Sequence, residues 1–393
     1  MYSAKQGLEA TQTFFRSALA EGVLLENAIV QFMERHGIRG KVDSTGSLLI
    51  LDYDQIRCKF DAPHGFVCRG LILDARSFDL VSMPLNKFWN NGEGKAATLD
   101  WTTAQALDKL DGSMVQRFFN PHTNQFECST RFQLPEDTIK NKPSDHATTW
   151  AQLISRCLKD WEEILLTQPK DETWVFEVMC PLNQVVVRHA GYSAKILAAR
   201  NNKTLEETPF DSLPGGPERR PKSYQFTSAA EVAAFANTFA ATENEGFVVC
   251  DAGFNRIKIK SDEYVRLHHL RNGINSVRSL LMMARGNDYE EVVAHFPEFK
   301  PDLDTLAGLI NEVITQHEDA YEKYKTIESQ KDFALAIQAA VEYKNALFLV
   351  RAKKQPSVRA AFLALDETPF VRIFKERAKK LLGDKYADEE PQT

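Results

Sequence analysis

The stretch DKLDGSMV, residues 108–115, places a lysine two positions before an aspartate–glycine pair, and an apolar run follows it. Asp-Gly is a strong turn signal, because both residues tolerate the backbone angles of tight hairpins. Taken alone, the stretch predicts a β-hairpin in which Lys109 is an ordinary solvated charge. The alternative is that Lys109 takes part in chemistry, and the rest of the sequence must decide between the two.

The composition indicates a globular protein rather than a disordered one. The chain has 393 residues, 43% apolar and 26% charged, which suffices for two or three domains. No run approaches the roughly 20 apolar residues of a membrane span, and the start MYSAKQGLEATQTFF lacks the pattern of a signal peptide. We therefore expect a cytoplasmic protein, in the host cytoplasm if the source is viral, with no membrane partner and a monomeric state.

Charge and cysteine usage exclude some classes of function. The formal net charge of -6 argues against a protein that coats nucleic acid by bulk attraction, but it permits a local basic groove. The cysteines form no C-x-x-C pair, so neither a zinc site nor a disulfide framework is expected. They are Cys58, Cys68, Cys128, Cys157, Cys180 and Cys250.

Short runs rich in β-branched and aromatic residues predict a body of antiparallel sheets up to residue 261. Helices are expected at 7–36, with a break at Gly22 and a stop at Gly37, and also at 147–166 and 228–241. The expected strands are GSLLILDYD (46–54), FVCRGLILD (66–74), SMVQRFFN (113–120), QFECSTRF (125–132), TWVFEVMC (173–180), NQVVVRHAGY (183–192), SAKILAAR (193–200), GFVVCD (246–251) and RIKIKS (256–261).

The second part of the chain reads as helical. The stretch 206–223 has the proline and glycine density of a surface loop, and strand signals nearly vanish after 262. The last helix should begin with Thr368 as its N-cap and end at Gly383. The predicted class is α+β, with an antiparallel-sheet domain at 1–261 and an all-helical domain at 262–393.

A lysine needs help to act as a nucleophile, because its ordinary pKa of about 10.4 keeps it protonated at neutral pH. Desolvation or nearby cations supply that help. Lys258 and Lys260 lie two apart on an expected strand and so on one face. An exposed, solubilising edge strand is the alternative for this pair.

Other charged residues stand beside apolar strands. Glu177 interrupts an apolar strand, and Glu245 directly precedes a glycine and another apolar strand. A carboxylate in such a place is costly unless it meets a metal, a cation or a hydroxyl, although a strand-end glutamate in water remains possible. Arg69 precedes an apolar strand, and Lys87 adjoins two aromatic residues whose surface suits a nucleotide.

The order of these residues resembles that of the covalent nucleotidyltransferases, and the whole set resembles the phage-type ATP-dependent RNA ligase 1 family. A single K-x-D-G motif is weak evidence for this resemblance, whereas seven motifs in family order and near family spacing are specific evidence for it. The motifs are CRGLILD (68–74), NKFWNNGE (86–93), KLDGSMV (109–115), STR (129–131), VFEVMCPLNQVVV (175–187), EGFVV (245–249) and RIKIKSDEYVRLHH (256–269).

The resemblance implies an ATP-dependent RNA ligase with a nucleotidyltransferase fold. In such enzymes Lys109 would attack the α-phosphate of ATP, forming lysyl-AMP and releasing pyrophosphate. AMP would pass to an RNA 5′-phosphate, and a 3′-hydroxyl would then displace it to seal the strand. The implied partner is RNA with 5′-phosphate and 3′-hydroxyl ends, cleaved tRNA among them, and the implied cofactors are ATP with Mg²⁺ or Mn²⁺.

The resemblance also implies roles for single residues. Lys258 and Lys260 would contact phosphate oxygens and help Lys109 lose its proton, and Glu245 would hold the metal. Glu177 would contact the ribose or support the metal. The remaining implied nucleotide-binding residues are Arg69, Lys87, Trp89, Asp111 and Gly112; Phe176 and Val248 are candidates to sandwich the adenine; and the implied RNA-binding residues are Arg131, Arg266, His268 and Arg271.

Three alternatives share parts of this pattern. DNA ligases and capping guanylyltransferases use the same lysine chemistry, but they usually have arginine where this chain has Met114, and they append a β-rich domain where this chain reads helical. A catalytically inactive RNA-binding factor would have no need of both the lysine and the two glutamates. The sequence therefore favours an RNA ligase.

Overall fold

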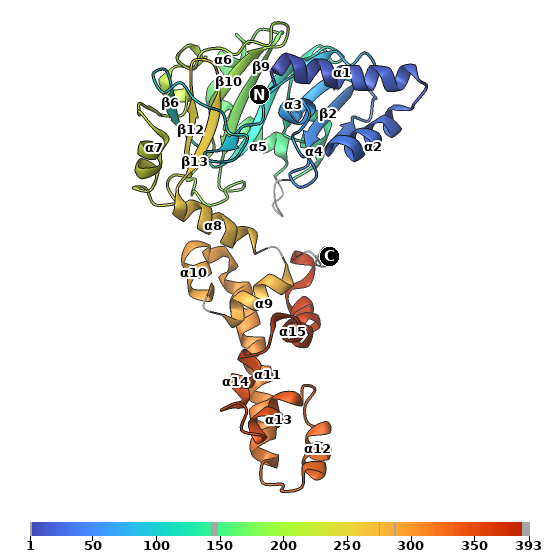
Figure 1. Cartoon of the computed structure of the whole chain (residues 1–393), viewed down its shortest axis with the longest axis vertical. Coiled ribbons are helices and arrows are strands. Elements are labelled where there is room, and N and C mark those ends of the chain that lie inside the picture. Colours follow the sequence, from blue (N-terminus) through green and yellow to red (C-terminus); the bar gives the residue numbers. More distant parts are fainter. Residues whose placement is uncertain (1, 143–147, 275, 287, 387–393) are drawn as a thin grey trace. The chain divides into compact units, whose positions relative to one another are not determined.

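The structure is a computed structural model that describes residues 2–142, 148–274, 276–286 and 288–386 (Figure 1). The chain divides into two compact units, Met1–Val265 and Arg266–Thr393. The first unit contains three sheets with helices against them, and the second is helical in its described residues. The predicted α+β class, sheets first and helices after about residue 262, is confirmed.

The first sheet, sheet A, is an antiparallel meander near the N-terminus. One face packs against two helices through a core that includes Phe15 and Phe32. The first helix begins at a capping box in which the Ser3 hydroxyl accepts the Gln6 amide, and the second ends at Gly37 in the left-handed conformation, as predicted. The elements are α1 (Ala4–Ala20), α2 (Leu25–His36), β1 (Ile38–Val42), β2 (Leu48–Tyr53), α3 (His64–Val67), β3 (Arg69–Asp74) and β4 (Leu80–Ser82).

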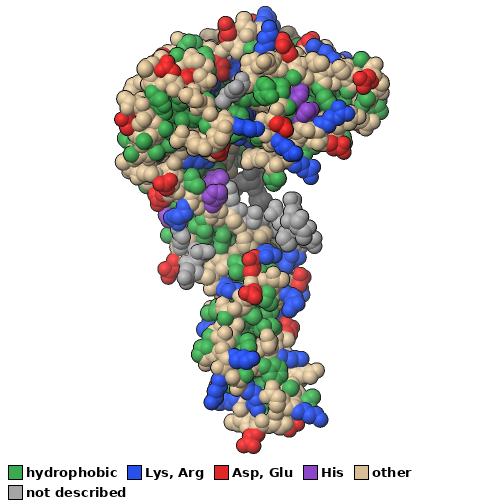
Figure 2. Space-filling model, viewed as in Figure 1, with side chains coloured by type: hydrophobic (Ala, Val, Ile, Leu, Met, Phe, Trp, Pro, Cys, Tyr) green, Lys and Arg blue, Asp and Glu red, His purple; other side chains and the backbone are tan. Residues whose placement is uncertain are grey.

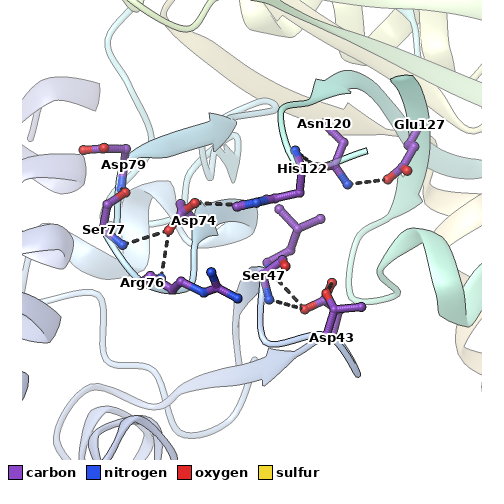
Figure 3. Close-up of polar contacts among 11 residues, drawn as sticks. Asp43, Ser47, Asp74, Arg76, Ser77, Asp79, Asn120, His122 and Glu127 are labelled. Carbon is purple, nitrogen blue, oxygen red and sulfur yellow. Dashed lines mark hydrogen bonds and ion pairs between the residues drawn. The ribbon is translucent and has the colours of Figure 1, made fainter. Parts of the chain in front are cut away.

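A polar network ties the turn between β3 and β4 to the neighbouring sheet (Figure 3). Asp74 accepts the backbone amides of Arg76 and Ser77 with one carboxylate oxygen. Its other oxygen lies 2.8 Å from Nε2 of His122, which comes from the loop that follows the next long strand. The network therefore holds the β3–β4 turn of sheet A against a loop of the sheet described next.

The second sheet, sheet C, has the strand order β10-β9-β7-β8. Its outer face is covered by short helices around the buried rings of Trp161 and Phe176. The elements are β7 (Ser113–Asn120), β8 (Gln125–Thr130), α4 (Pro135–Lys140), α5 (Trp150–Cys157), the 3₁₀ turn Lys159–Trp161, α6 (Glu162–Leu165), β9 (Glu172–Met179) and β10 (Ser193–Asn201).

The third sheet, sheet B, has the order β11-β6-β12-β13-β5, and α7 packs against its outer face (Figure 1). Its inner side meets sheet C, because Phe88, just before β5, packs against Val175 and Ala198 of β9 and β10. The pair β13 and β5 is parallel. The elements are β5 (Trp89–Asn90), β6 (Gln105–Asp108), β11 (Ser223–Tyr224), α7 (Ala229–Ala236), β12 (Gly246–Cys250) and β13 (Arg256–Lys260).

Three local predictions are wrong. The strand expected at 183–192 is irregular, because the Asp111 carboxylate accepts backbone amides there that a strand would use in its ladder. The helix expected at 147–166, whose first residue lies outside the described ranges, breaks where the indole of Trp161 turns inward and donates to the Ala194 carbonyl. The last helix begins earlier than expected, with Asp366 and not Thr368 as its N-cap; Pro369 still fits the first turn, where backbone amides lack helical partners.

The second unit is built around the long helix α11. One face of this helix is apolar and buried, including Leu303, Leu306 and Ile310. Figure 2 shows basic and acidic side chains interspersed over the visible face of the second unit. None of the helices in the described ranges combines the length and the apolar character needed to cross a bilayer. The helices are α8 (Asp262–Asn272), α9 (Val277–Arg285), α10 (Asp288–His295), α11 (Lys300–Tyr324), α12 (Gln330–Gln338), α13 (Asn345–Arg351), α14 (Val358–Leu363) and α15 (Glu367–Leu382).

Candidate active site

Lys109 lies on the link between two sheets. It follows β6 of sheet B, and β7 of sheet C begins four residues later at Ser113. The two strands pair with different neighbours, so the hairpin interpretation of DKLDGSMV is wrong. The Lys109 amide donates to the Gly246 carbonyl at 2.8 Å, which holds the link against β12.

A buried carboxylate bridges two lysines beside this link. The Lys109 Nζ lies 2.6 Å from Oε2 of Glu245, and the Lys260 Nζ lies 2.8 Å from Oε1. The Glu245 side chain is only 3% exposed, whereas each lysine side chain is 23% exposed. The glutamate is therefore held inside the protein, while both ammonium groups remain within reach of a ligand.

Lys258, the other lysine of the K-x-K pair, is surrounded by cationic side chains. Burial, with the charges of Lys87, Lys109, Lys260 and Arg69, lowers the pKa of Lys258 to about 7. Burial also lowers the pKa of Arg69, whose guanidinium lies 5.6 Å from the centre of the Phe88 ring. Because like charges close together disfavour one another, this cluster favours a polyanionic ligand.

Glu177 faces the same cluster from sheet C. One of its oxygens accepts the Gly112 amide at 3.1 Å. Burial raises the pKa of Glu177 to about 7, even though the charge of Lys109 acts in the opposite direction. A carboxyl group of this kind is partly protonated at neutral pH and can donate or accept a hydrogen bond.

Gly112 and Gly246 allow neighbouring backbone segments to approach closely next to Lys109 and Glu245. A Cβ at Gly112 would lie 2.4 Å from the Val178 carbonyl oxygen, and one at Gly246 would lie 2.2 Å from the Ile259 oxygen. Gly246 also has a φ of 132°, which side chains disfavour. The glycines of K-x-D-G and E-G therefore allow close backbone approach within sheet C and within sheet B, respectively, beside the site.

Asp111 supports the site by holding a loop. Its carboxylate oxygen Oδ2 accepts the amides of Val186 and Val187, each at 2.7 Å, and the carboxylate also hydrogen-bonds the hydroxyl of Tyr264. The Lys260 ammonium lies 5.2 Å from the centre of the Tyr264 ring. Sequence reasoning missed Tyr264, although it lies in the motif that begins with RIKIKS.

Lys87 and Trp89 belong to an aromatic group beside the cluster. The Lys87 ammonium lies 5.1 Å, 5.4 Å and 5.7 Å from the ring centres of Tyr53, Phe60 and Trp89. The guanidinium of Arg131 lies over Tyr53 as well, at 4.4 Å from the ring centre. The predicted site residues thus fall into two adjacent groups, the cluster around Glu245 and this aromatic group.

The two candidates for sandwiching adenine differ in position. Phe176 is fully buried against Trp161 on the outer face of sheet C, so its ring cannot contact a ligand, and that hypothesis is wrong. Val248 is part-exposed and pairs with Lys258 in register, which places both on one face of sheet B. Phe88, 5.9 Å from the Lys258 ammonium, is an aromatic ring at the cluster that sequence reasoning did not assign to the adenine.

The predicted RNA-binding residues are dispersed. Arg131 is held in the first unit, where its Nε donates to Asp52 Oδ1 at 2.7 Å. Arg266, His268 and Arg271 lie on α8, in the part of that helix that belongs to the second unit. The structure therefore assigns these four residues to different units.

The carboxylates of the site suit a metal bound together with a ligand. In the part of the chain that the structure describes, no group of three or more His, Cys, Asp or Glu side chains could by itself hold a metal ion. Both oxygens of Glu245 already contact lysines. Mg²⁺ is commonly held by one or two carboxylates together with substrate phosphates, and Glu245 and Glu177 fit that manner of binding.

Comparison with known proteins gives a consistent result. A family model described as RNA ligase matches residues 67–264, about half of the chain. A protein of Autographa californica nuclear polyhedrosis virus, named as a putative bifunctional polynucleotide kinase/RNA ligase, is 24% identical over 376 residues. The match covers 91% of this chain but 53% of that protein, so the chain spans about half the length of the relative.

Solved structures of similar proteins carry RNA ligase names as well. One form of an archaeal ATP-dependent RNA ligase matches 94% of this chain and 90% of its own, at 13% identity and a TM-score of 0.41. The other form matches 82% of this chain and 77% of its own, at 16% identity and a TM-score of 0.39. A Naegleria gruberi RNA ligase with pyrophosphate covers 43% of this chain and 52% of its own, at 15% identity and a TM-score of 0.32. Scores this low do not establish a shared fold.

Proposed function

The chain belongs to the RNA ligase family, and on that premise we propose that it is an ATP-dependent RNA ligase that joins 5′-phosphate and 3′-hydroxyl RNA ends. The observation that carries the proposal is the arrangement around Glu245. Lys109 and Lys260 contact the two oxygens of the buried Glu245 carboxylate. Lys258, whose pKa is lowered to about 7, lies beside them. A cluster of this kind binds phosphates and can free a lysine nucleophile.

In the first step, the unprotonated Nζ of Lys109 attacks the α-phosphorus of ATP. A nitrogen–phosphorus bond forms, the bond from that phosphorus to the bridging oxygen breaks, and pyrophosphate leaves. Lys258 and Lys260 neutralise the charge that builds on the phosphate oxygens. Glu245 is within 2.6 Å of the Lys109 Nζ and is placed to accept its proton.

In the second step, an oxygen of the RNA 5′-phosphate attacks the same phosphorus. The bond to Lys109 breaks, its nitrogen takes up a proton, and a 5′–5′ pyrophosphate links AMP to the RNA. In the third step, the 3′-hydroxyl oxygen of another end gives up its proton and attacks the RNA phosphorus. The bond from that phosphorus to the oxygen that bridges it to AMP breaks, AMP leaves, and a phosphodiester remains. Positioning and cationic stabilisation carry all three steps.

Magnesium, when bound, would supply further neutralisation of the phosphate charge. Glu245 and Glu177 are the carboxylates that would hold it, since they face the cluster from opposite sheets. Gly112 donates its amide to Glu177 and so orients that carboxylate. These contacts place the carboxylates of the site before any ligand arrives.

We further propose a role in RNA repair, cleaved tRNA included. The viral relative's name joins an RNA ligase to a polynucleotide kinase, and a kinase supplies the 5′-phosphate that this reaction consumes. The function of the second unit in recognising such RNA is part of this proposal. Arg266, His268 and Arg271 on α8 are its candidate contacts.

Incubation with α-labelled ATP and Mg²⁺ tests the first step without RNA. We expect covalent AMP on the wild-type protein and none on Lys109→Ala, while Lys159→Ala, which removes an exposed lysine of a 3₁₀ turn outside the motifs, keeps the label. Label from GTP instead of ATP would indicate a capping enzyme. No label from either nucleotide would indicate an inactive binding factor and would overturn the proposal.

The later steps need 5′-phosphorylated strands. Single-stranded RNA should be converted to circles with release of AMP, and the matching DNA strand should react far more slowly. A preference for nicked DNA would contradict RNA joining. The comparison uses the same enzyme preparation, so loss of folding cannot explain a difference between the two substrates.

A further inference from the structure

A cavity of about 330 Å³ lies beside the cluster around Glu245, and four of its eight lining residues are aromatic. We call it the aromatic pocket. Its volume is at the lower end of the range of small-ligand sites in proteins. Its lining includes Tyr2, Phe60, Phe66, Trp89 and Lys95.

The rings of the pocket are arranged for stacking. The planes of Phe66 and Trp89 are within 10° of parallel, with ring centres 6.3 Å apart. Phe60 stands edge-on to Trp89 at 5.7 Å. All three rings keep part of their surface in solvent. A flat ligand could therefore lie against a ring face while a second ring holds its edge.

Cations stand at the border of the pocket. The Lys95 ammonium is fixed by the carbonyl oxygens of Lys59 and Phe60, each at 2.6 Å, and so its charge stays at the rim. The Lys87 ammonium lies 5.4 Å from the centre of the Phe60 ring. Aromatic faces with nearby ammonium groups match a nucleobase with its phosphate, and a purely apolar peptide would leave these charges without a counterpart.

The pocket adjoins the catalytic cluster through one short strand. In the parallel pair of β5 and β13, Trp89 is in register with Ile257, and Asn90 is in register with Lys258. Residues in register share a face of the sheet, so Trp89 lies on the face opposite Lys258. Lys87 is the nearby charge with the largest effect on the pKa of Lys258, after burial. The pocket is thus next to the phosphate-binding cations and separate from them.

We propose that the aromatic pocket binds one nucleobase of the single-stranded RNA end that is being joined. The proposal rests on the proposed function, because it takes RNA as the substrate and names a place where RNA is held. It gives Trp89 an RNA contact in place of the contact with ATP that the family resemblance implies. Since lysyl-AMP forms before RNA is needed, the pocket should matter only for the later steps.

The test uses Tyr2→Leu and Phe66→Leu, which keep apolar bulk but remove ring faces of the pocket other than the two that lie against the Lys87 ammonium. The substrate is a 5′-phosphorylated single-stranded oligoribonucleotide, and the control is Phe126→Leu, a part-buried ring that pairs with Phe119 on another sheet. Base stacking on a ring contributes enough that we expect the KM for RNA to rise at least about fivefold. The rate of lysyl-AMP formation and the KM for ATP should match wild type and the control.

A set of oligoribonucleotides with one abasic position at each place near the ends identifies the base. One of these substrates should weaken binding to wild type as much as the ring variants do, and it should cause no further loss in those variants. Crosslinking with 5-iodouridine at that position should label a peptide that contains Phe60, Phe66 or Trp89.

Three results would overturn the inference. The first is an unchanged KM for RNA in both ring variants while RNA is still sealed. The second is a raised KM for ATP with no effect on RNA, which would give the pocket to the nucleotide. The third is a concentration-dependent dimer that both variants abolish, which would give it to a second copy of the chain. Absence of lysyl-AMP in wild type is a different failure, that of the proposed function.

Discussion

Lys109 and Glu245 form a close ion pair, with 2.6 Å between the lysine Nζ and the Oε2 of the glutamate, and the same carboxylate contacts Lys260 at 2.8 Å through its other oxygen. A carboxylate shared by two ammonium groups holds both in place and offsets their repulsion. It also places a carboxylate oxygen where it can take up the Lys109 proton when the lysine attacks. Binding of phosphates to Lys260 would weaken the contact between Lys260 and Glu245 and leave that carboxylate to Lys109.

Replacing Glu245 by Gln should separate positioning from folding. The amide keeps the size of the side chain but cannot offset two positive charges, so we expect the rate of lysyl-AMP formation to fall at least about 100-fold. The measurement is single-turnover labelling with α-labelled ATP, and Glu243→Gln, an exposed neighbour, is the matched control. A rate within a factor of about three of wild type in Glu245→Gln would show that the bridge is not needed.

Replacing Lys258 by Met should stabilise the protein and abolish activity. The folded state disfavours the charged form, because burial and neighbouring cations lower the pKa of Lys258 to about 7. Removing that charge should raise the melting temperature of the ligand-free protein by roughly 2–4 °C. Lys260→Met should lower it, since Glu245 would lose a partner at 2.8 Å. Equal shifts of the two melting temperatures would contradict this account.

The same pKa predicts how stability depends on pH. The pKa of Lys258 is about 7 in the folded protein, against an ordinary value of 10.5 for the unfolded chain, so the folded protein binds fewer protons between these values. The free energy of unfolding should therefore gain a rising contribution from about pH 7 upward. Denaturant titrations at about pH 7 and pH 9 should show this contribution in wild type and not in Lys258→Met.

Glu177 should make the free energy of unfolding fall as the pH rises, which is opposite to the effect of Lys258. Burial raises its pKa from 4.5 to about 7, so the folded protein binds more protons than the unfolded chain in that window. The stabilising contribution of Glu177 to the free energy of unfolding is present below pH 4.5 and is lost as the pH rises through about 7. We expect Glu177→Gln to be more stable than wild type at about pH 7.5 and equally stable near pH 4.5, as judged by urea unfolding. A constant difference at all pH values would argue against a raised pKa.

Replacing Gly246 by Ala should damage the fold next to the site. The new Cβ would lie 2.2 Å from the Ile259 oxygen at a φ of 132°, so strain alone should cost about 1–3 kcal/mol. Gly191→Ala is the matched control, because a Cβ there meets no atom within 4 Å. Thermal unfolding of both variants decides the point, and equal melting temperatures would exclude strain at Gly246.

Much of the candidate site could be found in the sequence because its residues stand in short motifs of fixed order. The K-x-K spacing placed Lys258 and Lys260 on one face, and the glutamates stood out as charges in apolar surroundings. Phe88 and Tyr264 could not be assigned in this way, since their positions depend on which strands meet. The hairpin interpretation of DKLDGSMV failed for the same reason, because Asp111 and Gly112 lie on the link between β6 of one sheet and β7 of another.

The sequence by itself determined the α+β class, the change to helices near residue 262 and the identity of the charged residues at the site, because periodicity and motif order are local properties of the chain. The tertiary structure alone decided that Lys109 and Lys260 share one buried carboxylate, that Asp111 holds the 183–192 segment out of a strand, and that Trp89 faces away from Lys258. These relations depend on strand register and on contacts between distant segments, and side-chain patterns along a chain do not specify them.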